Sequence, residues 1–224
     1  MTIRHWPPQE RPREKLLQQG AQALSDAELL AILLRSGVRG ATAIDLGREL
    51  IADFGSLTRL LAAGMDEVTG RNGLGRAKYA QLLAVRELAR RLLGEELRTG
   101  DVLDNPRAVS DYLRLAIGAR EIEVFVVIFL SVRNQVLAVR EVSSGTLTET
   151  RVYPREIVRQ ALSFNACSVI VAHNHPSGVA EPSESDVRLT QRLRAALELV
   201  DIRLLDHFVV TEGRTLSFAE RGLL

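Results

Sequence analysis

Hydrophobic residues in the first hundred positions recur every three or four residues, the spacing that places side chains on one face of an α-helix. The predicted helices begin near residues 15, 25, 42, 56 and 76, and the last one extends to residue 93. Ser25 followed by Glu28 has the residue types of a capping box, which marks a helix start. Residues 1–13 contain three prolines and show no such period, so we expect an arm on the surface.

After residue 105 the pattern mixes helical spacing with short apolar runs rich in valine, isoleucine and phenylalanine, which are typical of buried strands. We expect helices over residues 106–117, 154–164 and 183–199. Strands are predicted over residues 124–130, 136–142, 167–172, 202–205, 208–210 and 216–218. The first two strands form a hairpin, and the whole pattern predicts an α/β domain with a mixed sheet.

Residues 94–102 separate these two patterns. They mix charges with two glycines and show no apolar face, which predicts a linker. We place a domain boundary near residue 101, with an all-helical domain over residues 1–100 and the α/β domain over residues 101–224. A chain of 224 residues is long enough for two such domains.

Composition limits the class of protein only a little. A hydrophobic fraction of 46% with 25% charged residues is typical of a globular protein, and the net charge of +1 favours no particular partner. The single cysteine, Cys167, excludes an intramolecular disulfide and a thiolate-rich zinc site. No apolar run approaches the ~20 residues that a membrane span needs, and the N-terminus lacks the apolar core of a signal peptide. We therefore expect a cytoplasmic protein with no membrane partner.

The most informative stretch follows the apolar run at residues 169–172. His173 and His175 are two positions apart, so their rings point to the same side of an extended chain. A loop rich in proline and serine can then reverse the chain, and the helix predicted from residue 183 has Asp186 in its first turn. Two imidazoles and one carboxylate are typical ligands of a catalytic zinc ion, which keeps a fourth position for water. The pattern predicts one divalent metal ion held by His173, His175 and Asp186, and zinc is the working hypothesis.

Several residues in or near the candidate site have a second interpretation. Ser183 and Asp186 fit the N-cap and N3 positions of the helix as well as they fit a site. Cys167 fits a small strand residue near the site or a fourth ligand. His207, beside Asp206, fits a hydrogen-bonding pair around the ligands or an ordinary strand edge. The sequence leaves these alternatives open.

The ligand spacing resembles a known motif. His-x-His-Pro, six residues, Ser, two residues, Asp is the motif of JAMM/MPN+ metalloproteases, and this chain is similar to it at His173, His175, Pro176, Ser183 and Asp186. A longer set of segments resembles the bacterial RadC (UPF0758) proteins, namely residues 145–146, 154–157, 173–178 and 205–207. Residues 6–7, 10–16 and 24–30 extend that resemblance to essentially the whole chain.

The resemblance implies an MPN-like mixed-sheet domain with cytidine-deaminase-like layering and a zinc-dependent peptidase or isopeptidase activity on a peptide or protein. It also implies that Ser183 assists the oxyanion and that a glutamate near the start of an upstream strand acts as the base. Glu123, which opens the run at residues 124–130, fits this base best. Glu121 and Glu141 are the alternatives.

Residues 68–78 contain a Gly-hydrophobic-Gly turn directly before a predicted helix. Backbone N–H groups at such a helix start can bind a phosphate, and residues 71–91 carry six basic side chains against one acidic. The segment resembles a helix-hairpin-helix element, which implies DNA as a partner through residues 70–91. A plain helix connector with a solvated basic face explains the same pattern. The candidate contacts are Gly73, Gly75, Arg76 and Lys78.

Three functions compete on this evidence. The first is a zinc hydrolase of peptide or isopeptide bonds, with the helical domain positioning a partner. The second is a DNA-associated binding protein, an accessory of repair or recombination, whose metal site is not catalytic. The third is a metal-dependent nuclease, which is disfavoured because a His₂Asp site with one open position suits one zinc ion better than two magnesium ions. The sequence determines neither the substrate nor the oligomeric state.

Overall fold

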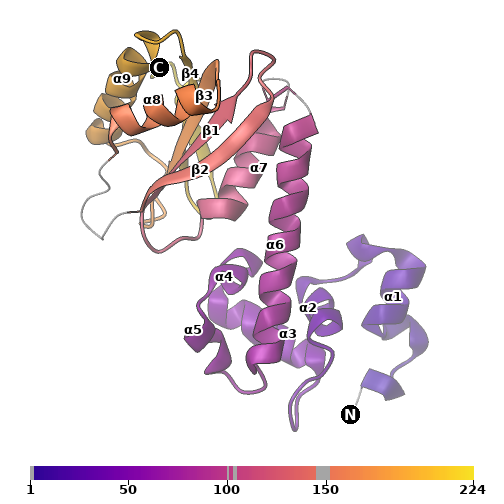
Figure 1. Ribbon diagram of the computed structural model, residues 1–224. Helices are drawn as coiled ribbons and strands as arrows, with labels where there is room; N and C mark the ends of the chain where they lie inside the picture. The colour runs from indigo at the N-terminus through magenta and orange to yellow at the C-terminus, as the bar shows by residue number, and fades with distance from the viewer. Residues whose placement is uncertain (1–2, 100, 103–104, 145–151) are drawn as a thin grey trace. The chain divides into compact units, whose positions relative to one another are not determined.

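The computed structural model describes residues 3–99, 101–102, 105–144 and 152–224 (Figure 1). The chain forms two compact units, residues 1–88 and 89–224, each with its own hydrophobic core. Residues 145–146, which contribute to the family resemblance, lie outside the described residues. In the part of the chain that the structure describes, no helix is long and apolar enough to cross a membrane.

The first unit is helical, as predicted. Its elements are α1 (Pro12–Gln19), α2 (Asp26–Leu34), α3 (Ala43–Phe54), α4 (Leu57–Ala62), α5 (Met65–Thr69), the beginning of α6 (Arg76–Thr99) and short 3-10 turns at Ile3–His5, Pro8–Glu10 and Ala21–Ala23. The capping box at the start of α2 is confirmed, because Ser25 Oγ accepts the N–H of Glu28 and a Glu28 carboxylate oxygen accepts the N–H of Ser25. Leu34, Leu50 and Leu60 are buried in the centre of the unit.

The predicted arm is mostly exposed; it forms short 3-10 turns at Ile3–His5 and Pro8–Glu10, and Trp6 packs against the cluster that contains Ala27 and Ala31. One prediction about the helical region was wrong. Helix α6 continues through Gly94 to Thr99, where a linker was predicted. Burial of Leu97 in the core of the second unit favours the helix there and offsets the cost of about 1 kcal/mol that a glycine brings to a helix interior.

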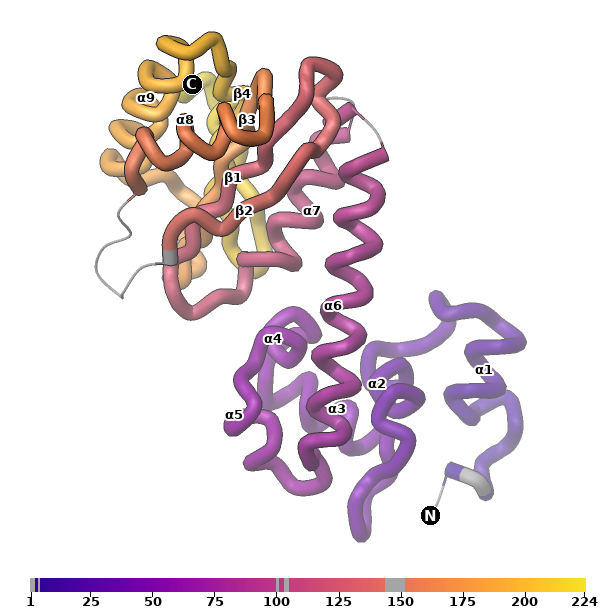
Figure 2. Tube along the Cα trace, viewed as in Figure 1, coloured from indigo at the N-terminus to yellow at the C-terminus, as the bar shows by residue number. Residues whose placement is uncertain are grey.

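The second unit is built on one mixed sheet, which confirms the predicted α/β class. Its strands are β1 (Val124–Leu130), β2 (Val136–Ser144), β3 (Ser168–Asn174), β4 (Arg203–Val210) and β5 (Thr215–Ser217). They lie in the order β2-β1-β3-β4-β5, and β3 and β4 run parallel to each other while the other neighbouring pairs are antiparallel. The course of these strands can be followed in Figure 2.

Helices cover both faces of this sheet. Helix α7 (Pro106–Ile117) lies on one face, and α8 (Pro154–Ser163) and α9 (Glu184–Glu198) lie on the other (Figure 1). Successive side chains of β1 alternate between the faces, so Val126 joins the α7 core whereas Phe125 joins the core under α8 and α9. His173 is paired with Phe125 across β3 and β1, which places its ring on the α9 face.

Strand β4 is continuous where two short strands were predicted. The polar pair Asp206 and His207 interrupts the apolar pattern, yet both residues lie within the strand. The carboxylate of Asp206 accepts the N–H groups of His207 (2.7 Å) and Ala219 (3.0 Å), and it also accepts the hydroxyl of Ser217. Ser217 and Ala219 come from the region of β5, so the local pattern alone could not predict these two partners.

We expect Leu193→Ala, in the middle of α9, to lower the free energy of unfolding by about 2–5 kcal/mol, because it leaves a cavity in the core between α9 and the sheet. Urea unfolding followed by circular dichroism measures this loss. The matched control is Leu199→Ala, directly after α9, whose side chain is 87% exposed and whose removal should change stability by less than about 0.5 kcal/mol. Equal effects of the two substitutions would contradict this packing.

Candidate metal centre

Three side chains meet at the end of β3. The strand ends at Asn174, but the chain stays extended for one more residue, because the N–H of His175 donates to the carbonyl of Val210 (2.9 Å) on the neighbouring strand. The two histidine rings therefore lie on the same side, as the two-residue spacing predicts. His173 is only 1% exposed, whereas the His175 side chain reaches solvent.

Asp186 reaches these rings from the first turn of α9. Its Oδ1 lies 3.2 Å from His173 Nε2, and its Oδ2 lies 3.4 Å from His175 Nε2. The two Nε2 atoms are 2.9 Å apart. One ligand atom from each of the three residues falls within 4.8 Å of the others, so the group could hold a single metal ion.

The N-cap of α9 and the candidate ligand are hydrogen-bonded to each other. Ser183 is the N-cap of α9, and its Oγ accepts the N–H of Asp186 (3.2 Å). In return, Asp186 Oδ2 accepts the N–H (2.7 Å) and the hydroxyl (2.7 Å) of Ser183. This reciprocal capping box holds the Asp186 carboxylate toward the histidines, and it confirms the structural interpretation of both residues.

A row of hydrogen bonds behind His173 determines which of its ring nitrogens carries the proton. The hydroxyl of Thr190 donates to the carbonyl of Asp186 (2.6 Å), so its oxygen accepts from Nδ1–H of His207 (2.6 Å). His207 Nε2 is then an acceptor and receives Nδ1–H of His173 (2.8 Å). With Nδ1 protonated, neutral His173 has its lone pair on Nε2, which points toward His175 and Asp186.

The same reasoning applies to His175. Its Nδ1–H donates to the carbonyl of Val179 (2.8 Å) in the loop before α9, which leaves the Nε2 lone pair of the neutral ring facing that of His173. Two lone pairs at such a short distance repel each other unless a cation lies between them. The hydrogen-bond pattern therefore fits a bound metal ion, independently of the sequence spacing.

Electrostatics at the centre favour a bound cation. Burial opposes ionisation of Asp186, but the protonated forms of His173 and His175 donate hydrogen bonds from Nε2 to this carboxyl and hold its pKa well below its usual range. The hydrogen bond to Asp186 raises the pKa of His175 above its ordinary value against the effect of burial, and the negative charge of Glu123 contributes in the same direction. Burial lowers the pKa of His207 well below its ordinary value, so this ring is neutral.

Asn174, between the two histidines, fixes the segment that precedes β1. Its side-chain oxygen accepts the N–H of Val124 (2.8 Å), and its amide nitrogen donates to the carbonyls of Arg120 (3.0 Å) and Ile122 (3.0 Å). Glu123 lies between the two clamped residues, and its position therefore depends on the same strand end that carries the histidines.

The register of the sheet and the exposure of the side chains indicate which of the three candidate glutamates lies near the histidines. Extending the pairing of Phe125 with His173 by two residues brings Glu123 opposite His175. Glu141 is paired with Val126, whose side chain packs on the α7 face, and it forms an ion pair with Arg120 (3.5 Å). Glu121 is exposed. Glu123 is thus the candidate base whose charge acts on His175, while its chemical role stays a prediction.

Four residues were missed, left undecided or misplaced from the sequence. Thr190 and Asn174 gave no signal beyond their polar character, and His207 was left undecided between a site residue and a strand edge. Cys167 was expected near the site, but it precedes the first residue of β3 and lies at the opposite end of the strand from His173, about 20 Å away along six residues. It is therefore distant from the candidate ligands.

The candidate nucleic-acid contacts belong to the first unit. Gly73 has φ +81°, and a Cβ there would lie 2.1 Å from Cγ1 of Val38, so the turn requires glycine for packing. Arg76 is the first residue of α6, and Lys78 donates to the carbonyl of Ser36 (2.7 Å). These contacts give Gly73 and Lys78 structural roles. Contact of Gly73, Gly75, Arg76 and Lys78 with DNA stays a prediction.

The fold and the centre together define a class: a three-layer α/β domain in which the end of a central strand and the start of a helix bring two histidines and an aspartate to one point. Comparison with known families agrees. A model described as the RadC-like JAB domain matches residues 103–223, and a model described as the UPF0758 N-terminal family matches residues 3–80. The chain belongs to the UPF0758 family.

Full-length relatives support this assignment. A UPF0758 protein of Chromobacterium violaceum is 62% identical over 224 residues, and one of Nitrosomonas eutropha is 56% identical over the same length. A relative in Aromatoleum aromaticum is 59% identical over 225 residues. Each match covers 100% of this chain and 100% of the relative.

We expect Thr190→Val to weaken zinc binding roughly 10–100-fold, because it removes the oxygen that fixes the tautomer of His207 and, through it, that of His173. Isothermal titration calorimetry with zinc measures the change. The control is Thr211→Val, which also removes a buried hydroxyl, one that donates to the carbonyl of Arg214 (2.9 Å) and does not contact the histidines. Equal affinities of the Thr190 variant and the wild type would contradict the tautomer argument.

Zinc affinity should fall as pH is lowered through the raised pKa of His175, by about tenfold per pH unit below it, because a proton and the metal compete for Nε2. In the metal-free protein, protonated His175 stabilises the fold below its unfolded pKa, and this stability is lost as pH rises through the raised folded pKa. Zinc titrations between pH 8 and 5.5 test the first trend, and thermal unfolding of the metal-free protein tests the second. A pH-independent zinc affinity over this range would rule out Nε2 of His175 as a ligand.

Proposed function

We propose that this protein is a zinc-dependent hydrolase that cleaves peptide or isopeptide bonds. The observation that carries the proposal is the convergence of two imidazole lone pairs and one carboxylate at a partly exposed point, with a further carboxylate, Glu123, opposite His175. Membership in a family with a RadC-like JAB domain supports a metal-dependent hydrolase fold.

The donor set supports zinc among the divalent metals. Two imidazole nitrogens and one carboxylate oxygen form a three-ligand set of the kind found in catalytic zinc sites, whereas magnesium and calcium prefer sites made of oxygen atoms. Such an ion, when bound, supplies a Lewis acid and lowers the pKa of a water from about 15.7 to about 7. His173, His175 and Asp186 are the residues that would hold it.

The remaining chemistry falls to this chain's own side chains. In the proposal, the Glu123 carboxylate takes a proton from the attacking water and delivers it to the leaving amine. Asn174 holds the backbone on both sides of Glu123, which keeps this carboxylate near His175. Ser183 supplies a hydroxyl to the oxyanion of the substrate carbonyl. In the structure that hydroxyl donates to Asp186, so it must turn toward the substrate to act.

We expect Glu123→Gln to keep zinc but to lower hydrolysis about 10²–10⁴-fold, because the amide has no charge with which to accept a proton. Zinc content by atomic absorption and cleavage of a broad peptide library by mass spectrometry measure the two properties in the same preparations. The controls are Glu121→Gln and Glu141→Gln, which should retain wild-type activity, and His175→Ala, which should lose zinc and activity together.

Other outcomes favour other functions. If the wild type binds zinc and cleaves neither library peptides nor isopeptide-linked substrates, the metal site is not catalytic and the protein is better described as a binding protein. If Glu141→Gln abolishes activity while Glu123→Gln does not, the base is assigned to the wrong glutamate. Metal-dependent cleavage of DNA without cleavage of peptides would favour a nuclease.

A further inference from the structure

Strand β2 forms one edge of the sheet. It pairs with β1 along one side, and among the described residues no strand pairs with its other side. An unpaired strand edge presents a row of backbone N–H and C=O groups that can pair with another extended chain, and proteins commonly cover or charge such edges to prevent this.

A groove of about 550 Å³ runs along this edge, entirely within the second unit. Five consecutive strand residues, from Val136 to Arg140, line one side, and α6 residues between Arg90 and Arg98 line the other. Buried side chains of Leu97, Tyr112 and Ala138 contribute apolar surface. The groove therefore combines an open strand edge with walls that present both apolar and charged side chains, a combination that can recognise an added strand.

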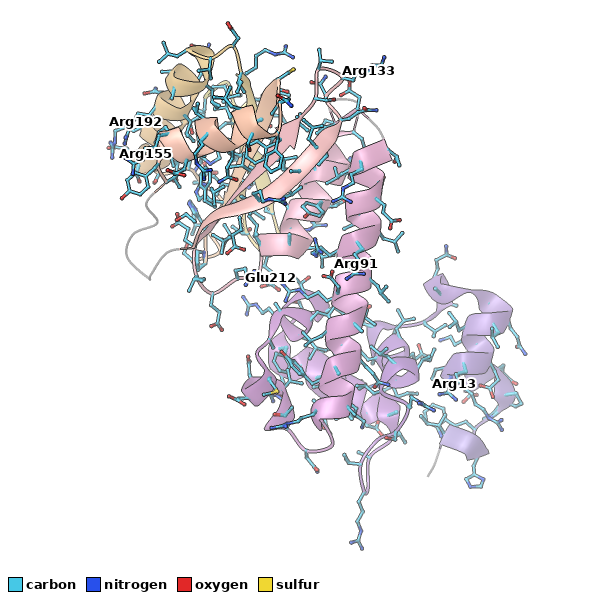
Figure 3. The ribbon with its side chains drawn as sticks, viewed as in Figure 1. Arg13, Arg91, Arg133, Arg155, Arg192 and Glu212 are labelled. Carbon is cyan, nitrogen blue, oxygen red and sulfur yellow. The ribbon has the colours of Figure 1, made fainter. Side chains whose placement is uncertain are left out.

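The groove is strongly basic. Its lining includes four arginines and one acid, Glu95. The guanidinium of Arg140 lies over the ring of Phe164 (5.2 Å) and donates to the carbonyl of Val139 (3.0 Å), so it is held at the strand edge. Arg90 donates to the hydroxyl of Tyr112 (3.5 Å). Arg91 is the next residue of α6 (Figure 3). The arginines of the groove are Arg90, Arg91, Arg98 and Arg140.

We propose that this groove binds an extended, acidic segment of another protein, which adds to the edge of β2 as a further strand. The strand edge supplies main-chain hydrogen bonds, the apolar walls accept alternate side chains, and the arginines select carboxylates. A second copy of this chain is a poor occupant, because pairing two β2 edges would bring two arginine-lined grooves together. The proposal is independent of the metal centre, since β2 residues 136–140 pair with the part of β1 beyond Phe125, the partner of His173.

Fluorescence anisotropy with a labelled decapeptide of alternating Glu and Val tests the proposal, with the Lys-Val decapeptide and a short duplex DNA as comparison probes. The full-length double variant Arg98→Glu/Arg140→Glu should bind the Glu-Val peptide at least about tenfold more weakly than the wild type. The matched control is Arg155→Glu/Arg192→Glu, which changes the charge equally on exposed residues of α8 and α9, away from α6 (Figure 3), and should bind like the wild type.

Backbone methylation of the peptide separates strand addition from simple charge attraction. Alternate N–H groups of an added strand face its partner, so N-methylation of every second residue should abolish binding in one frame and preserve it in the other. Equal binding of both methylated frames, or equal losses in the two double variants, would overturn the proposal. So would arginine-dependent binding of the duplex DNA without binding of the peptide, or a concentration-dependent dimer that Arg98→Glu/Arg140→Glu dissociates.

Discussion

The candidate centre depends on a short row of hydrogen bonds that crosses the interior from α9 to β3. Thr190 fixes the tautomer of His207, His207 fixes that of His173, and the lone pair of His173 is thereby directed at Asp186 and His175. Every member of the row is buried, so each polar atom needs its partner to offset lost hydration. The position of α9 on the sheet and the orientation of the candidate ligand His173 are consequently set by the same contacts.

Residues at the centre stabilise the fold as well as form the site. Asn174 closes three backbone hydrogen bonds of the segment before β1, and Asp186 completes the capping box of α9. A buried group left without its partner costs about 1–3 kcal/mol, so substitutions here reduce stability as well as metal binding. Loss of function in such variants therefore identifies a role in the site only if folding is measured as well. Substitutions that keep the shape of the side chain disturb folding least.

In the second unit, the ends of the central strands and the edge strand β2 form two different kinds of surface. The central strands β1 and β3 bury both faces, and the end of β3 brings polar and charged groups together from residues far apart in the chain. The edge strand β2 leaves its backbone accessible and is lined by arginines on the neighbouring helix. A metal centre needs the rigidity of the first arrangement, whereas recognition of an extended segment needs the open hydrogen-bonding groups of the second.

The sequence by itself determined the features that depend on local spacing. The apolar run of β1, the capping boxes at Ser25 and Ser183, and the common side of His173 and His175 follow from periods of two and from residues three apart. Tertiary structure decided the features that depend on distant partners. Burial of Leu97 stabilises the part of α6 that follows Gly94. Hydrogen bonds from Ser217 to Asp206 and between Thr190 and His207 stabilise these two polar residues within one continuous strand. The β1–β3 register brought Glu123, rather than Glu141, to the face of the histidines. Such contacts form only when segments far apart in the chain pack together. Hydrophobic periodicity predicts local secondary structure, but it does not predict which segments pack against each other.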